Sequence, residues 1–110
     1  MKNIYSNIFP YNKKSLHKTI TDLNKGNIVG LPTETVYGLA GNAYSKESVQ
    51  KIYKLKKRPK INPLIVHFYN YEDAKNDIIL TSSFFKLYKK FCPGPITFIL
   101  KKKIIQKFIQ

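Results

Sequence analysis

The apolar residues of this 110-residue chain fall into short blocks of two kinds, and proline or glycine ends most of them. Apolar residues three or four positions apart are typical of helices, whereas continuous runs of four or five are typical of buried strands. The helix-like blocks are residues 15–25, 45–56, 70–79 and one that begins at Ser82 or Ser83; the strand-like runs are 28–31, 64–68 and 96–100. Their alternation along the chain predicts an α/β fold, in which helices pack on a sheet.

Local signals set the expected boundaries of these blocks. Gly26 stands where a C-terminal cap ends the first helix, and Ser45 is a good N-cap for the second. Pro59 ends the second helix, and Pro93-Gly94-Pro95 breaks the last one. Lys101–Lys103 is expected to form an exposed turn. No linker or repeat divides the chain, so we expect residues 1–110 to form one domain.

Composition excludes several classes of protein. An apolar fraction of 43% provides for a real core. No apolar run approaches the roughly 20 residues of a membrane span, and no signal peptide is recognisable. The single cysteine, Cys92, cannot form an internal disulfide, and we expect it to be a buried structural thiol. His17 and His67 are far apart, so no metal site built by the protein is expected. These features favour a cytoplasmic protein without a membrane partner.

The formal net charge is +14, a field that attracts nucleic acid or phosphorylated substrates. A lysine-rich composition caused by codon usage is an equally good explanation of the charge itself. Codon usage explains why 19 of the 20 basic residues are lysine, but not why one, Arg58, is arginine. A planar guanidinium binds two phosphate or carboxylate oxygens at once, which an ammonium does not. Arg58 is therefore a candidate site residue, with chance as the alternative.

Three segments could contribute to a site. Residues 32–39, Pro-Thr-Glu-Thr-Val-Tyr-Gly-Leu, follow a strand-like run and offer two hydroxyls and a carboxylate, although an ordinary polar turn has the same composition. Residues 56–63, Lys-Lys-Arg-Pro-Lys-Ile-Asn-Pro, form a basic loop suited to phosphate oxygens, although lysines are also common at helix ends. His67 ends an apolar run, where a core histidine is the usual explanation.

Together these segments resemble one family. The blocks 32–39, Lys56-x-Arg58-Pro59, 62–67 (Asn-Pro-Leu-Ile-Val-His) and 93–97 (Pro-Gly-Pro-Ile-Thr) are similar, in order and spacing, to those of the YrdC family of threonylcarbamoyl-AMP synthases. The likeness runs from about residue 20 to residue 100. It implies the YrdC-like fold, a twisted mixed sheet with flanking helices around a concave, positively lined cavity.

The resemblance also implies an activity. Members of the family are nucleotidyltransferases that convert L-threonine, bicarbonate and ATP into threonylcarbamoyl-AMP and pyrophosphate, for modification of tRNA. By that likeness Thr35 and His67 would bind threonine, and Lys56, Arg58 and Asn62 would bind ATP. Lys56 and Arg58 would be the catalytic pair, and Mg²⁺ would be held mainly by the nucleotide. A non-catalytic fragment that binds RNA or nucleotide, with tRNA or double-stranded RNA as partner, is the alternative.

The chain departs from the family pattern in two small ways and one large way. Ala40 and Gly41 exchange two small residues, and Cys92 replaces the tryptophan that usually precedes Pro-Gly-Pro. The family's Ser-x-Asn motif and a further threonine-binding arginine would lie beyond Gln110. We therefore expect an incomplete YrdC-like domain, corresponding to an N-terminal portion, which is either a fragment of a split or decayed gene or needs a second polypeptide that carries the missing half of the site.

Overall fold

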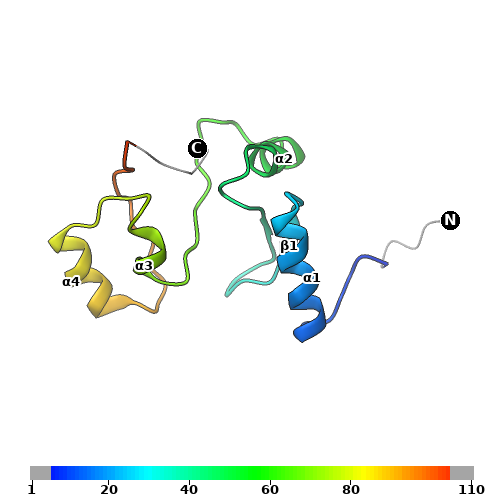
Figure 1. Ribbon diagram of the computed structural model, residues 1–110, viewed down its shortest axis with the longest axis horizontal. Helices are drawn as coiled ribbons and strands as arrows, with labels where there is room; N and C mark the ends of the chain where they lie inside the picture. Colours follow the sequence, from blue (N-terminus) through cyan, green and yellow to red (C-terminus); the bar gives the residue numbers. More distant parts are fainter. Residues whose placement is uncertain (1–5, 105–110) are drawn as a thin grey trace. The chain divides into compact units, whose positions relative to one another are not determined.

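The computed structural model describes residues 6–104. The described residues up to Pro63 form one compact unit, and those from Leu64 onward form a second (Figure 1). Helices and short extended segments make up both units, and the first also contains a small antiparallel sheet. The protein is therefore of the predicted α/β class, and we describe each unit by itself.

The first unit begins with helix α1, Lys13–Asn24. It starts two residues before the predicted boundary, because Asn12 caps it: the Asn12 side chain accepts from the Ser15 backbone N–H, and the Ser15 hydroxyl accepts from the Asn12 backbone N–H. The predicted C-terminal glycine is confirmed. Gly26 has φ +81°, and its N–H donates to Leu23 O at 3.1 Å. A glycine adopts this left-handed conformation at the lowest cost.

A hairpin follows α1. Strands β1 (Val29–Leu31) and β2 (Gly38–Ala40) pair antiparallel, with Leu31 opposite Gly38. The first strand agrees with the predicted run 28–31, whereas β2 was not predicted, because its Gly-Leu-Ala sequence carries almost no strand signal. Residues 32–37 thus become the loop of a hairpin.

Helix α2, Lys46–Lys56, agrees with the prediction and has Ser45 as its N-cap. Its buried face carries Ser48, Val49 and Ile52. The Ser48 hydroxyl is fully buried and donates to Gly26 O at 2.8 Å, which ties α2 to the end of α1. A Cβ added to Gly41 would meet the Ile52 and Ser48 side chains at 3.2 Å, so this glycine allows the chain after β2 to approach α2 closely.

The second unit packs around aromatic rings. Helix α3, Tyr71–Ala74, begins after the N-cap Asn70 but ends well before the predicted residue 79. Helix α4, Ser82–Phe91, begins at a predicted position, with Thr81 as its N-cap. Phe84, buried on α4, contacts Phe98 with ring centroids 4.8 Å apart, and Tyr71 contacts Phe85 and Tyr88 edge-on.

The two strands predicted at 64–68 and 96–100 are wrong, because both segments lie outside any strand or helix. They also are not covered on both faces: Ile65 is 63% exposed and Ile99 98% exposed. A strand requires a ladder of hydrogen bonds with a neighbour, and within the described part of the second unit the pairing is a single bridge between Ile78 and Lys102. That bridge replaces the turn predicted at 101–103, although these lysines are exposed as expected.

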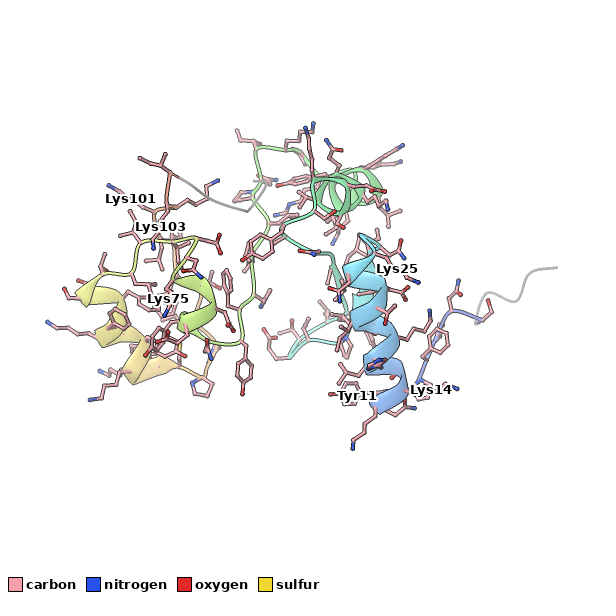
Figure 2. All side chains as sticks on the ribbon, in the orientation of Figure 1. Tyr11, Lys14, Lys25, Lys75, Lys101 and Lys103 are labelled. Carbon is pink, nitrogen blue, oxygen red and sulfur yellow. The ribbon has the colours of Figure 1, made fainter. Side chains whose placement is uncertain are left out.

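Lysine side chains surround this bridge. Figure 2 shows Lys75, Lys101 and Lys103 on the second unit, where the Lys103 ammonium donates to the backbone carbonyl of Lys75. Cys92, at the end of α4, is a free thiol and is half-buried rather than fully buried. Across residues 6–104, the helices are too short or too polar to span a bilayer.

Candidate functional site

The basic loop 56–63 begins where α2 ends, in a left-handed turn. Lys57 has φ 50° and ψ 37°, its N–H donates to Lys54 O, and the N–H of Arg58 donates to Tyr53 O at 3.0 Å. This is the hydrogen-bond pattern of a Schellman cap, in which glycine normally occupies the left-handed position. A lysine there costs about 1–2 kcal/mol of backbone strain. The strained residue lies between the two candidate catalytic residues, Lys56 and Arg58.

The guanidinium of Arg58 closes the loop on itself. Its Nε donates to the backbone carbonyl of Asn62 at 3.2 Å, and its Nη2 donates to that of Pro63 at 3.1 Å. The Asn62 N–H also donates to Pro59 O at 3.0 Å. Two carbonyls in adjacent peptide units hold one edge of the planar guanidinium, so its plane has a defined orientation. The edge formed by Nη1 and the second N–H of Nη2 has no partner among residues 6–104 and can bind two oxygens of one anion.

The residues around Arg58 give the loop a strong positive charge. Four lysines lie in the loop or in the last turn of α2, and neither they nor Arg58 form an ion pair with another described residue: Lys54, Lys56, Lys57 and Lys60. All are exposed, and Lys56 is the last residue of α2. Cations at a helix C-terminus interact favourably with the helix dipole. Five cations without an acidic partner are more than this interaction explains. Such a loop attracts phosphate groups.

The hairpin loop carries the other candidate of the first unit, Thr35. This loop is organised by Thr33, whose hydroxyl donates to Val36 O and accepts from the Thr35 N–H at 3.3 Å. Thr35 is exposed, and its hydroxyl has no protein partner among the residues described. Val36 and Tyr37 beside it are 71% and 81% exposed. The loop therefore presents the hydroxyl of Thr35 to solvent on a backbone organised by Thr33.

The structure thus brings together only part of the predicted set. Arg58 and Asn62 are in contact, but through the backbone carbonyl of Asn62, whereas its exposed side-chain amide is not involved. Thr35 and Lys56 belong to the same unit, without a hydrogen bond to Arg58 in the described region. His67 is exposed and belongs to the second unit, on the extended segment 64–68.

One contributor to the loop was missed. The Tyr53 hydroxyl donates to Asn62 O at 2.9 Å, so Tyr53 contacts the same carbonyl as Arg58. From the sequence alone, Tyr53 is predicted to be part of the apolar face of α2. The phenolic hydroxyl near a helix end was the available signal, because a tyrosine there usually finds a hydrogen-bond partner.

The second unit contains a shallow depression of about 270 Å³ lined by Phe91, Pro95 and Ile96. Its lining is apolar and lacks charged groups, so it does not suit a nucleotide. Among the described residues, the carboxyl groups with a lowered pKa are not part of the basic loop. A hydrogen bond from Lys18 lowers the pKa of Asp22, and Lys51 and Lys75 have the same effect on Glu47 and Glu72.

Comparison with known proteins gives a consistent result. The family model Sua5/YciO/YrdC, described as telomere recombination, matches residues 21–110. Threonylcarbamoyl-AMP synthases from Pyrococcus abyssi and Bacillus subtilis are 39% and 43% identical over 84 and 82 residues, covering 73% and 74% of this chain and 24% of each relative. A solved structure of Sua5 from P. abyssi superposes with a TM-score of 0.71 at 33% identity, over 76% of this chain and 26% of that one.

The chain spans about a quarter of the length of these relatives, and about half the length of shorter ones. The family match nevertheless includes the hairpin loop, α2 and the basic loop that follows it. The extent of the match and the agreement in fold lead to one conclusion: this chain belongs to the Sua5/YciO/YrdC family.

Proposed function

We propose that this chain carries the ATP-binding part of a threonylcarbamoyl-AMP synthase, which forms threonylcarbamoyl-AMP and pyrophosphate from L-threonine, bicarbonate and ATP for the modification of tRNA. Relatives with that printed name support the proposal. The observation that carries it is the orientation of Arg58. The only arginine of the chain is held by two loop carbonyls, and within residues 6–104 it keeps a bidentate edge free in a cluster of unpaired cations.

In this proposal the basic loop binds the phosphates. Arg58 contacts two phosphate oxygens through its free edge, and Lys56 contributes a movable ammonium two residues away. Negative charge increases on the departing pyrophosphate as the bond to the α-phosphate breaks, and these two cations stabilise that charge. The exposed Asn62 amide, which can both donate and accept, is placed to contact ATP as well.

Threonine recognition is assigned to Thr35 and His67. A hydroxyl can accept from the ammonium of an amino acid and donate to its carboxylate, and an imidazole can do either. Mg²⁺ arrives with ATP as part of the substrate. The cationic side chains of the loop do not fit a magnesium site, since Mg²⁺ prefers oxygen ligands from carboxylates, phosphates and water.

The remaining length of the family's proteins supplies the rest of the site, either as a continuation of this chain or as a separate polypeptide. The proposed partner is therefore a chain that carries the C-terminal part of the family domain. The exposed apolar side chains Ile65, Tyr69 and Ile99 support this, because a soluble protein normally covers such groups.

The test combines the chain with that C-terminal part from a family member and supplies ATP, L-threonine, bicarbonate and magnesium. We expect pyrophosphate release that requires threonine, bicarbonate and both polypeptides. A control with Arg58→Ala should abolish release, whereas Tyr11→Ala, at an exposed position before α1, should not. Pyrophosphate release that is absent with both halves present, or independent of threonine, contradicts the proposal.

The net charge of +14 favours RNA binding as a second function. A phosphate-dominated mode predicts that affinity for tRNA falls steeply between about 50 and 200 mM salt. Tight RNA binding together with no binding of ATP would favour this second function over the first.

A further inference from the structure

The hydroxyl of Tyr53 shares its acceptor with the candidate phosphate ligand. It donates to Asn62 O at 2.9 Å, and the Nε of Arg58 donates to the same oxygen at 3.2 Å. A carbonyl oxygen has two lone pairs, so these two donors use both. Tyr53 is half-buried on α2, whereas Arg58 and Asn62 are exposed in the loop. The shared carbonyl thus connects an exposed guanidinium to a packed helix.

We propose that Tyr53 is a positioning residue, which orients the guanidinium of Arg58 for an anionic ligand by holding the carbonyl of Asn62. The ligand assigned to it, the phosphates of ATP, rests on the proposed function. Tyr53 itself does not touch the ligand in this assignment. It acts through a single backbone oxygen, and the α2 helix supplies the rigidity.

The physical reason lies in the freedom of the loop. Among the described residues, the guanidinium of Arg58 forms hydrogen bonds with carbonyls of its own loop alone, at Asn62 and Pro63. Without the tyrosine hydroxyl the carbonyl of Asn62 could turn away, so its hydrogen bond with the Arg58 Nε–H would open more often and the free edge of the guanidinium would change direction. Fixing one of the carbonyls to α2 removes that motion before the ligand arrives, and pre-organisation of this kind lowers the entropic cost of binding.

Because the chain has a single arginine, the hydrogen bond between the Arg58 Nε–H and the Asn62 carbonyl can be measured directly. Only one arginine Nε–H signal is expected in an NMR spectrum of the 110-residue chain, and it belongs to Arg58. In the unaltered chain this proton should exchange with solvent several-fold more slowly than in free arginine, at mildly acidic pH. Exchange as fast as in free arginine would overturn the proposal without the need for any variant.

The variant Tyr53→Phe keeps the ring and removes only the hydroxyl. We expect it to speed the exchange of the Arg58 Nε–H about two- to tenfold, the range that one hydrogen bond controls. The matched control is Tyr11→Phe, since Tyr11 is 83% exposed and precedes α1 (Figure 2). It should leave the signal unchanged. Equal exchange in Tyr53→Phe and the unaltered chain would overturn the proposal.

Titration with MgATP separates this inference from the proposed function. The Arg58 signal should shift on binding, and Tyr53→Phe should weaken the affinity about two- to tenfold while Tyr11→Phe does not. If the unaltered chain binds MgATP and Tyr53→Phe binds it equally well, this inference alone is overturned. If the unaltered chain binds no MgATP, the proposed function and the ligand assigned here fail together.

Discussion

Replacing Ser48 by alanine and Lys51 by methionine, singly and together, measures how α2 is held to the end of α1. Both side chains donate to the carbonyl oxygen of Gly26, Ser48 Oγ from 2.8 Å and Lys51 Nζ from 3.2 Å. Gly26 and Ser48 are buried. The oxygen therefore has two donors from one helix and little access to water.

The magnitude follows from this sharing. Ser48→Ala removes one buried hydrogen bond, but Lys51 still satisfies the oxygen, so the loss should be about 1 kcal/mol. In the double variant the buried oxygen has no donor, and its desolvation penalty of about 1–3 kcal/mol is added. The double variant should therefore lose about 1 kcal/mol more than the sum of the two single losses. The ion pair of Lys51 with Glu47 is absent from both Lys51 variants, so it cancels in the cycle.

The free energy of unfolding is measured in urea by far-UV circular dichroism. A loss of about 1 kcal/mol corresponds to roughly 4–8 °C in Tm for a domain of this size. The control cycle combines Ser48→Ala with Lys46→Met, an exposed lysine on the same helix that makes no ion pair with a described residue. It should be additive within about 0.5 kcal/mol. Equal additivity in both cycles would refute the argument that the two donors satisfy one oxygen.

Arg58→Lys should impair ATP use about tenfold or more in the reconstituted enzyme, because one ammonium cannot bind two loop carbonyls and two phosphate oxygens in a fixed plane. Lys57→Ala should have a much smaller effect. Equal turnover of Arg58→Lys and wild type would mean that the arginine at this position has no special role. Gly26→Ala should lower the free energy of unfolding by about 1–2 kcal/mol, because Gly26 has a φ of +81°. Crowding is not the cause, since the nearest atoms to an added Cβ are 3.6 Å away. The control in thermal unfolding is Gly30→Ala, where nothing lies within 4 Å of the added Cβ. A hydrogen bond from Lys75 holds the pKa of Glu72 below its ordinary value. The stability that this hydrogen bond contributes is therefore present above the unfolded pKa near 4.3 and is lost as pH falls through the lower folded pKa. A ¹³C titration that gives an ordinary pKa for Glu72 would contradict this.

The helices of this protein were largely predictable from sequence. The end of α1 at Gly26 and both ends of α2 agree with prediction, because helix hydrogen bonds and caps involve residues within about five positions of each other. Where a helix boundary was misjudged, another local signal decided: Asn12 caps α1, so the helix begins at Lys13 rather than at Ser15. The order and spacing of the sequence blocks also led to the right family.

The strands were less predictable. An apolar run such as 64–68 or 96–100 indicates only that the chain can be extended, whereas a strand exists when a partner supplies its hydrogen bonds. The partner of β1 is Gly38–Ala40, a segment with no strand signal, which pairs because the hairpin loop brings it back to β1. Pairing of this kind depends on residues elsewhere in the chain, so periodicity alone cannot reveal it.

By itself, the sequence determined which residues are candidates: a unique arginine in a basic loop after a helix, and a threonine in a polar segment after a strand. Only the tertiary structure decided which groups hold them. It shows that Arg58 is held by carbonyls rather than by acidic side chains, and that the Asn62 backbone mediates the contact. It also shows that Tyr53 reaches that carbonyl from α2. The physical reason is that residue type sets which hydrogen bonds a group can make, whereas the folded path of the backbone sets which partners lie within 3 Å of it.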